Sequence, residues 1–372
     1  MTLWLRPVIA GLIKQDHARE VVSPAYDLFT PIERGEHARQ HPRSFLNGTP
    51  SEGDDPDLDY DGRRQQATSY LTSELGRGTW DFRPPGYFIL KIQSGAHTQV
   101  GVVGDVPHDS YPGAIRPHEA TRPGRVDDLI DYLETVGSGS SPVGLAYRRD
   151  PAIDLAIARI TARQPAIDVT FEDGDRQRVW RASQDEELMA ALAEIDSAYI
   201  IDGHHRVAAT VARGRDPSTP AGRFLAVAFP ADSLAVFPFH RWVDVPIDEI
   251  GAQPGPLKPA PGQAVAVTKA GEWSFDLHPA ADESDVSALA RGMLAALGIA
   301  DERTDPRLRF LPGFPDDEAL RKLVANEGGV GFILAPGTID EVLAVSDRGE
   351  FMPPKATFFS PKPRSGLFLV KR

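Results

Sequence analysis

Residues 198–212 read AYIIDGHHRVAATVA, and the pattern of the chain changes half-way along them. Residues 198–201 form a short apolar run that is typical of a buried strand. Residues 207–212 are small and mostly apolar, and Gly214 follows them, so they predict a helix that ends before this glycine. The five residues between, DGHHR, form the turn. A strand that leads through such a turn into a helix indicates an α/β protein.

The turn combines an acid, a glycine and three potentially basic side chains. Asp202 can cap the helix, and Gly203 lets the backbone approach a ligand closely, so the first N–H groups of the helix point outward. Charged forms of His204, His205 and Arg206 at the positive end of a helix dipole cost up to about 1 kcal/mol each. A bound phosphate reverses this sign, with Arg206 as a forked clamp and Asp202 as a ligand for Mg²⁺ or for a hydroxyl. The alternative is that Asp202 only caps and the histidines are ordinary surface or core residues.

Composition narrows the classes of function. The chain has 372 residues, 41% of them hydrophobic, which is enough for one large core or two ordinary ones. Acidic residues exceed basic ones by 53 to 40, and the net charge of −13 argues against nucleic acid as a partner. The absence of cysteine excludes thiolate catalysis, disulfides and cysteine-ligated metals. No leader-like start and no run of about 18 apolar residues is present, so we expect a cytoplasmic protein without a membrane partner.

Strand and helix patterns extend over the whole chain. A hairpin is expected around Ser94 and Gly95, and Ser183 with Glu186 indicates a capping box that opens a helix to about residue 195. Other helices are expected at 62–75, 127–136, 284–297 and from 340, and strands at 87–93, 99–103, 224–229, 234–237, 331–334, 357–359 and 367–370. The Pro- and Gly-rich passage 251–262 predicts a linker. We therefore expect a main α/β region at 1–250 and a second α/β region at 251–372.

A second candidate group lies on the loop that carries His118 and Glu119. The carboxylate of Glu119 is suited to deprotonate a substrate hydroxyl or to bind an ammonium group, and Arg125 nearby is suited to a phosphate or carboxylate. A solvated loop with local salt bridges is the alternative. Asp27, in a segment bounded by Pro24 and Pro31, is a further candidate metal or substrate ligand, and an Asx-turn explains it equally well.

A third group lies near the end of the chain. Lys355 and Lys362 flank Thr357 and a short strand, which predicts a cluster that holds phosphate. The alternative is that the lysines protect an edge strand from aggregation. Residues 240–242, His-Arg-Trp, offer another cation and an aromatic surface, and here packing is the favoured interpretation.

The strand-DGHHR-helix element resembles the phosphate-binding motif of the ParB/sulfiredoxin superfamily and is most similar in form to that of its free serine kinases. The rest resembles a large prokaryotic family known as domain of unknown function one thousand and fifteen. Four further stretches carry this second resemblance: SPAYD at 23–27, RPHEAT at 116–121, FPFHR at 237–241 and MPPKATFFSPK at 352–362. The last departs from the usual Lys-Ser-Thr of the family at Ala356, which lacks the hydroxyl.

The resemblance implies mixed sheets around a ParB/sulfiredoxin-like core and phosphorylation of a small hydroxyl-bearing amino acid, such as serine, with ATP or ADP. Phosphoryl transfer needs mainly positioning and charge neutralisation. We expect catalysis by Glu119, Asp202 and His204, with Mg²⁺ on Asp202. We expect nucleotide phosphates on Gly203, His204, His205, Arg206, Lys355, Thr357 and Lys362, and substrate on Asp27, His118, Glu119 and Arg125.

Two other functions compete with a small-molecule kinase. A nucleotide-binding switch would use the same turn without phosphorylating a substrate. Metal-dependent hydrolysis by His204 and His205 is the weakest alternative, because adjacent residues at a helix start do not face one way. The sequence does not distinguish ATP from ADP or fix the oligomeric state.

Overall fold

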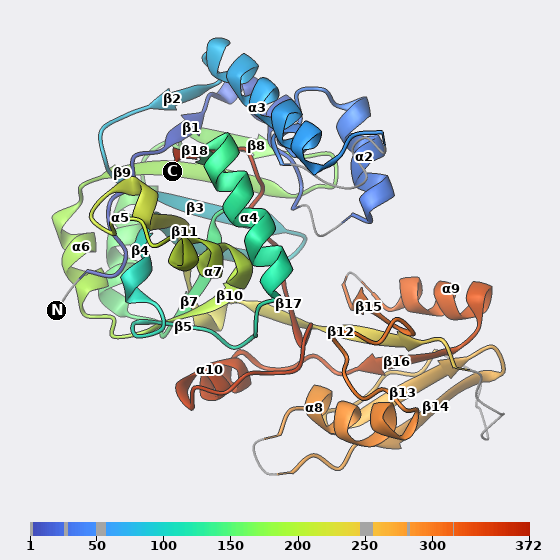
Figure 1. Cartoon of the computed structure of the whole chain (residues 1–372). Coiled ribbons are helices and arrows are strands. Elements are labelled where there is room, and N and C mark those ends of the chain that lie inside the picture. Colours follow the sequence, from blue (N-terminus) through green and yellow to red (C-terminus); the bar gives the residue numbers. More distant parts are fainter. Residues whose placement is uncertain (1–2, 26–28, 50–56, 246–255, 281–282, 315) are drawn as a thin grey trace. The chain divides into compact units, whose positions relative to one another are not determined.

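The computed structural model describes residues 3–25, 29–49, 57–245, 256–280, 283–314 and 316–372. The chain forms two compact units (Figure 1). Unit 1 comprises Met1–Pro117, Thr121–Ser233 and Pro361–Arg372, and unit 2 comprises His118–Ala120 and Leu234–Ser360. The units therefore change over at residue 233, rather than at the expected 250, and the last twelve residues return to unit 1. In the described part of the chain, no helix has both the length and the apolar character needed to cross a bilayer.

An eight-stranded sheet forms the frame of unit 1. Its strand order is β5-β10-β7-β11-β4-β3-β9-β8. The strands, in that order, are Ile115–Arg116, Ala198–Asp202, Val143–Tyr147, Arg223–Pro230, His97–Pro107, Tyr87–Ser94, Arg176–Ser183 and Ile167–Thr170. β10 runs parallel to β5 and antiparallel to β7, so the sheet is mixed. The expected α/β class and the hairpin of β3 and β4 are confirmed.

One face of this sheet carries the core of unit 1. Ile89, Val102, Ala228, Leu145 and Ile200 stand opposite one another on five successive strands and form a buried apolar row. Apolar residues of α5 (Pro151–Thr161), α6 (Glu186–Ala193) and α7 (His204–Arg213) pack in the same cluster. Helix α7, which follows the DGHHR turn, is thus held by the core, and α4 (Pro123–Val136) lies beside it (Figure 1).

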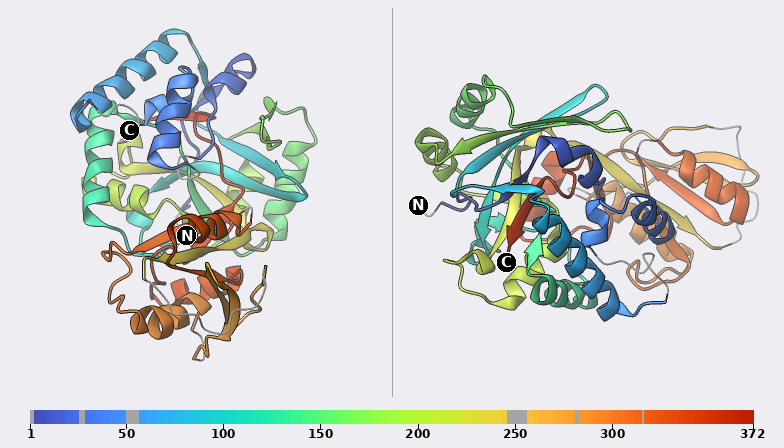
Figure 2. Two further views of the ribbon diagram at one scale, coloured as in Figure 1. Left: turned by 90° about the vertical axis from the view of Figure 1, so that its right-hand side faces the viewer. Right: turned by 90° about the horizontal axis from the view of Figure 1, so that it is seen from above.

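A small sheet joins the two ends of the chain within unit 1. Its order is β2-β1-β18-β6, from Trp80–Phe82, Gly11–Ile13, Phe368–Lys371 and Ser138–Gly139. Figure 2 shows the red C-terminal strand among the blue N-terminal elements. The rings of Phe88 and Phe368, 5.2 Å apart between centroids, connect this segment to β3. The residues that follow Ser360 are therefore part of the folded body of unit 1.

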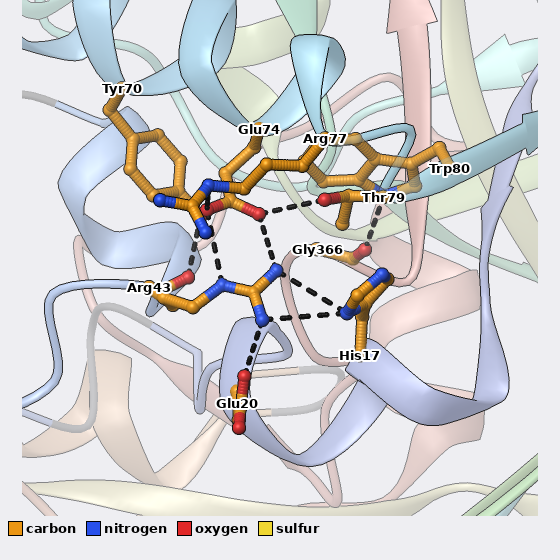
Figure 3. Close-up of polar contacts among 9 residues, drawn as sticks. All are labelled: His17, Glu20, Arg43, Tyr70, Glu74, Arg77, Thr79, Trp80 and Gly366. Atoms are coloured by element: carbon orange, nitrogen blue, oxygen red, sulfur yellow. Dashed lines mark hydrogen bonds and ion pairs between the residues drawn. The ribbon is translucent and has the colours of Figure 1, made fainter.

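A cluster around Arg43 fastens the N-terminal helices of unit 1 (Figure 3). Its guanidinium donates to both carboxylate oxygens of Glu74, at 3.2 and 2.7 Å, and also pairs with Glu20. Glu74 belongs to α3 (Tyr60–Gly76) and also accepts a 2.7 Å hydrogen bond from the Thr79 hydroxyl. Burial alone would raise the pKa of Glu74, but the hydrogen bonds from Arg43 and Thr79 outweigh it and lower this pKa below its usual range. The cluster therefore stabilises a charged carboxylate at a buried position.

The neighbours of this cluster extend it to the end of the chain. The Tyr70 hydroxyl donates to the Arg43 carbonyl, and the Trp80 indole donates to the Gly366 carbonyl, each at 2.8 Å (Figure 3). The helical segment η1 (Gln15–His17) and helices α1 (Ala18–Val21), α2 (Pro31–Gln40) and α3 complete this part of unit 1. Helix α3 includes the whole expected range 62–75, so that prediction is confirmed.

Unit 2 is built on a second sheet, whose strand pairs are antiparallel, with helices beside it. Its sheet has the order β14-β13-β16-β12-β15, with β17 also paired to β12. The strands are Gly271–Asp276, Gln263–Thr268, Val330–Leu334, Ala235–Val243, Leu308–Pro312 and Thr357–Ser360. Trp242, Val265 and Ile333 pack with Leu320 and Val324 of α9 (Glu318–Glu327). Helices α8 (Asp285–Leu289), continued by a π-helical turn at Ala290–Leu294, and α10 (Ile339–Asp347) complete it.

One local prediction is wrong. Ser183 does not cap the helix that follows, because it is the last residue of β9 and has a φ of 48°. Asp185 is the N-cap of α6, and its side chain accepts from the Leu188 N–H. The linker expected at 251–262 lies partly outside the described residues, since positions 246–255 are not described.

Candidate functional site: the turn between β10 and α7

Gly203 forms the sharp turn between β10 and α7. Its φ of 95° lies where only glycine is readily accommodated, and it occupies the N-cap position of the helix. Gly214, with a φ of 57°, ends the helix where the sequence predicted. The prediction that Asp202 caps the helix is wrong, because Asp202 is the last residue of β10 and no side chain caps α7. The first N–H groups of α7 thus follow directly after this glycine.

Asp202 lies between two cations. One carboxylate oxygen is 3.0 Å from the ammonium of Lys362, and the other accepts a hydrogen bond from the Arg206 guanidinium. The side chains of Lys362, Arg206 and Asp202 are 9%, 20% and 33% exposed. Lys362 reaches this carboxylate although 160 positions separate the two residues in the sequence. The turn therefore carries two positive groups and one negative group in a partly sheltered place, which suits an anionic ligand.

Arg206 braces the turn. Its guanidinium donates to the carbonyls of Ser141 and Pro142 at 2.6 and 2.7 Å, in addition to Asp202. The two carbonyls thus engage Arg206 within the fold. Its role as a phosphate clamp stays a prediction.

The histidines of the motif differ from each other. His204 is buried, with 8% of its surface exposed. The Nε2 atom of His205 accepts a 3.0 Å hydrogen bond from the main-chain N–H of Arg122. An accepting nitrogen carries no proton, so His205 is neutral in this arrangement. The unfavourable concentration of positive charge at the helix start is therefore smaller than the sequence suggested.

Asp202 is the residue that the sequence predicts to hold Mg²⁺, and Asp27, the other candidate metal ligand, lies outside the described residues. No group of three or more His, Asp or Glu side chains suited to a metal occurs in the described portion of the chain. Mg²⁺ is usually held by one or two carboxylates together with substrate phosphates, so a lone carboxylate suits only a metal that arrives with a nucleotide. Magnesium stays a proposal on this ground.

Two of the other sequence motifs meet in unit 2. The Nε2 atom of His118 lies 3.1 Å from the hydroxyl of Thr357 on β17, and the His118 carbonyl accepts from the Met352 N–H at 2.8 Å. Glu119 forms a parallel bridge with Met352. The loop that carries Glu119 is thus held against the segment that precedes β17. His118 is buried, and its role in substrate binding stays a prediction.

Arg241 joins the third motif to this group. It is fully buried and donates to the carbonyls of Phe239, Lys355 and Pro354 at 2.6, 3.2 and 3.0 Å. Burial lowers its pKa, while the carboxylates of Glu302 and Glu119 act to raise it. The packing interpretation of residues 240–242 is confirmed, since His240, Arg241 and Trp242 are all buried.

Lys355 adopts an unusual conformation in this group. Its φ is 54°, and its ammonium lies 4.9 Å from the centre of the Phe239 ring. Lys355 and Lys362 lie on either side of β17, as the sequence indicated. Lys355 and Glu119 belong to unit 2 and Asp202 to unit 1, and a pocket shared by all three stays a prediction.

The remaining substrate-binding candidates are Arg125 and Asp27. Arg125 lies on α4 and is 3.8 Å from Asp128, one turn further along. Asp27 lies outside the described residues. Their roles in substrate binding stay predictions.

Sequence reasoning missed the groups that hold these side chains in place. The contacts of the Ser141 and Pro142 carbonyls could not be predicted from the sequence, because any residue supplies a carbonyl. Gln99 and Gln177 hold the main chain next to Lys362, and a glutamine within a buried strand is a signal that the sequence does offer.

Comparison with known proteins identifies the family. The family model described as "Protein of unknown function (DUF1015)" matches residues 5–253, which is more than half of the 372 residues. The chain belongs to this family. The DUF1015 match includes Glu119 and the Asp202–Arg206 turn and ends before Lys355 and Lys362. No curated protein matches the chain.

Several solved structures share a limited likeness with this DUF1015 member. A free serine kinase in complex with AMP has 16% identity and a TM-score of 0.38, covering 69% of this chain and 86% of the kinase. SbnI with a C-terminal truncation, from Staphylococcus aureus, has 12% identity and a TM-score of 0.39, covering 71% and 85%. A conserved hypothetical protein from Pyrococcus furiosus has 14% identity and a TM-score of 0.38, covering 73% and 94%.

Proposed function

We propose that the protein is a nucleotide-dependent kinase of a small molecule, and that it phosphorylates the hydroxyl of a free amino acid such as serine. The observation that carries the proposal is the ammonium of Lys362, 3.0 Å from Asp202 at the glycine turn that opens α7. A helix start and a sheltered ammonium are the groups that bind phosphate oxygens. The likeness of the DGHHR sequence to the motif of free serine kinases supports the same ligand.

In this proposal the nucleotide phosphates bind the main chain of Gly203, His204 and His205. An ammonium has three donors, so Lys362 has the capacity to hold Asp202 and a phosphate oxygen together. Its charge offsets the charge that the terminal phosphoryl group spreads over its oxygens during transfer. Mg²⁺ bound with the nucleotide would supply further charge neutralisation beside Asp202.

The transfer moves one phosphoryl group. The bond from its phosphorus to the bridging oxygen of the donor breaks, and a bond to the substrate hydroxyl oxygen forms. The hydroxyl proton passes to a base, for which we propose Glu119. With ATP the other product is ADP, and with ADP it is AMP.

A nucleotide-binding switch without transfer is the second candidate. It is favoured by the two cations that bind the two oxygens of Asp202, because a carboxylate held in this way is a poor proton acceptor. If no other carboxylate serves as base, the turn binds nucleotide and no phosphorylated product forms.

The decisive experiment offers the protein serine, threonine and homoserine with ATP or ADP and detects the phosphorylated amino acid by ³¹P NMR. We expect product from the parent protein and at least about a tenfold lower rate from Lys362→Met, since a charge-assisted hydrogen bond is lost. Lys322→Met, which removes an exposed lysine paired with Glu318, is the matched control and should keep the parent rate.

Glu119→Gln separates the kinase from the switch. The substitution is nearly isosteric, and loss of a general base lowers turnover by roughly 10²-fold while nucleotide binding remains. Nucleotide binding without any phosphorylated amino acid in the parent protein favours the switch. Neither binding nor product in the parent protein refutes both.

A further inference from the structure

Two buried glutamines lie in one row of residues that crosses three strands of unit 1. Ile92 on β3 stands opposite Gln99 on β4 and opposite Gln177 on β9. Residues directly opposite one another in a sheet share a face, so the two glutamines flank Ile92 on the same side. Gln99 is 2% exposed and Gln177 is fully buried. Two buried amides in one row of a sheet need partners, because a buried amide without one is strongly destabilising.

The partners are the two peptide groups on either side of Lys362. The Gln99 side chain donates to the Pro361 carbonyl at 2.8 Å, and the Gln177 side chain donates to the Lys362 carbonyl at 3.3 Å. The Arg364 N–H donates in return to the Gln177 oxygen at 3.4 Å. Prolines at 361 and 363 lack N–H groups, so this segment is poorly suited to pair as a strand. Side-chain amides thus satisfy the main-chain carbonyls on either side of the residue whose ammonium meets Asp202.

This arrangement fixes an otherwise mobile side chain. Lysine carries its charge on a flexible four-carbon stem, and its position depends on where its main chain is held. The side chain of Lys362 is nevertheless 9% exposed and ends 3.0 Å from Asp202. An apolar pair in place of the glutamines would fill the same space without holding the main chain.

We propose that Gln99 and Gln177 are positioning residues of the site at Asp202, and that they act through Lys362. The inference rests on the proposed function for the identity of the ligand, a nucleoside diphosphate or triphosphate. The placement of Lys362 itself is independent of that function and is measurable without nucleotide.

The test compares Gln99→Met and Gln177→Met in the parent and in a Lys362→Met background, with ADP affinity measured by calorimetry. Methionine has nearly the size of glutamine, so the core keeps its volume. Each substitution should raise the dissociation constant of ADP about 3- to 10-fold in the parent, the range of one hydrogen bond, and leave it unchanged when Lys362 is already methionine. Equal effects in the two backgrounds would overturn the proposal, since they indicate a general structural role.

Two controls keep the result interpretable. Gln15 also bonds a main chain, with both of its hydrogen bonds to Asp168 at 2.9 Å, so Gln15→Met should leave ADP affinity unchanged.

Reductive methylation of Lys362 without nucleotide, followed by mass spectrometry, should be at least about threefold faster in Gln99→Met and Gln177→Met than in the parent. If the parent does not bind ADP, the nucleotide proposal fails, and the methylation rate alone decides: equal rates reject the positioning role. Each glutamine variant is a sufficient test by itself, so if one of them does not fold, the other still tests the proposal.

Discussion

At the residue scale, Gly203 combines a backbone requirement with a close contact. A Cβ atom added here would lie 2.8 Å from the Arg206 guanidinium, at a φ of 95° that other residues rarely adopt. We expect Gly203→Ala to lower the free energy of unfolding by about 1–2 kcal/mol for the backbone alone, and to displace Arg206 from Asp202. Urea denaturation measures the first effect.

Gly95→Ala is the matched control for this prediction. Gly95 has a φ of 55° and nothing within 4 Å of its added Cβ, so only the backbone effect should appear. We therefore expect a larger loss of stability at Gly203 than at Gly95. Equal losses would show that the contact with Arg206 has no energetic role.

Part of the site follows from local sequence and part does not. The apolar run before Asp202, the glycine and the small residues after Arg206 predict a strand, a turn and a helix, because each is a local preference. The partner atoms of Arg206 are main-chain carbonyls of Ser141 and Pro142. Every residue has such a carbonyl, so the residue type does not predict these contacts. Arg206→Ala consequently removes a brace as well as a cation, and Lys362 is the cleaner probe of phosphate binding.

At the scale of elements, the Arg43 cluster joins the helices of the N-terminal part of unit 1 (Figure 3). The Glu74 side chain is 4% exposed, so Arg43→Met would leave a buried carboxylate without its main partner. We expect a loss of about 3 kcal/mol in the free energy of unfolding, the lower end for a broken buried pair, because Arg43 is 24% exposed. Arg83→Met, which removes an arginine that is 64% exposed and paired with Asp81, should cost less than about 1 kcal/mol.

The same cluster gives a pH dependence. The pKa of Glu74 is lower in the folded protein than its usual value, so the unfolded chain binds the proton more strongly. The stabilising contribution is complete above about pH 4.3, the ordinary glutamate pKa, and is lost as the pH falls through the lower folded pKa. Urea midpoints from pH 6 downward should therefore converge for the parent and Arg43→Met at acid pH. A constant difference down to acid pH would contradict this role of Glu74.

The start of α6 shows that local sequence alone does not fix where a helix begins. Ser183 and Asp185 are both residues that cap helices and lie two positions apart. The strand β9 extends through Ser183 because it pairs with Tyr87, and this long-range pairing decides which of the two becomes the cap. Local preference alone could not distinguish them.

At the scale of the whole molecule, the path of the chain was the least predictable feature. The composition at 251–262 indicated a linker, but it gave no sign that residues 361–372 rejoin unit 1. β18 pairs with β1 across more than 350 positions. The alternating apolar pattern of a strand does not predict which other strand pairs with it. The return of the chain is nevertheless what brings Lys362 to Asp202.

The most direct test of the central claim is NMR of the main-chain amides at the turn. The chain has 10 histidines and 33 glycines, so ¹⁵N-histidine and ¹⁵N-glycine labelling gives few signals. If nucleotide phosphates bind at the start of α7, addition of ADP should shift the amide signals of Gly203, His204 and His205 in the parent and far less in Lys362→Met. Shifts elsewhere, with these three amides unchanged at saturating ADP, would contradict the account.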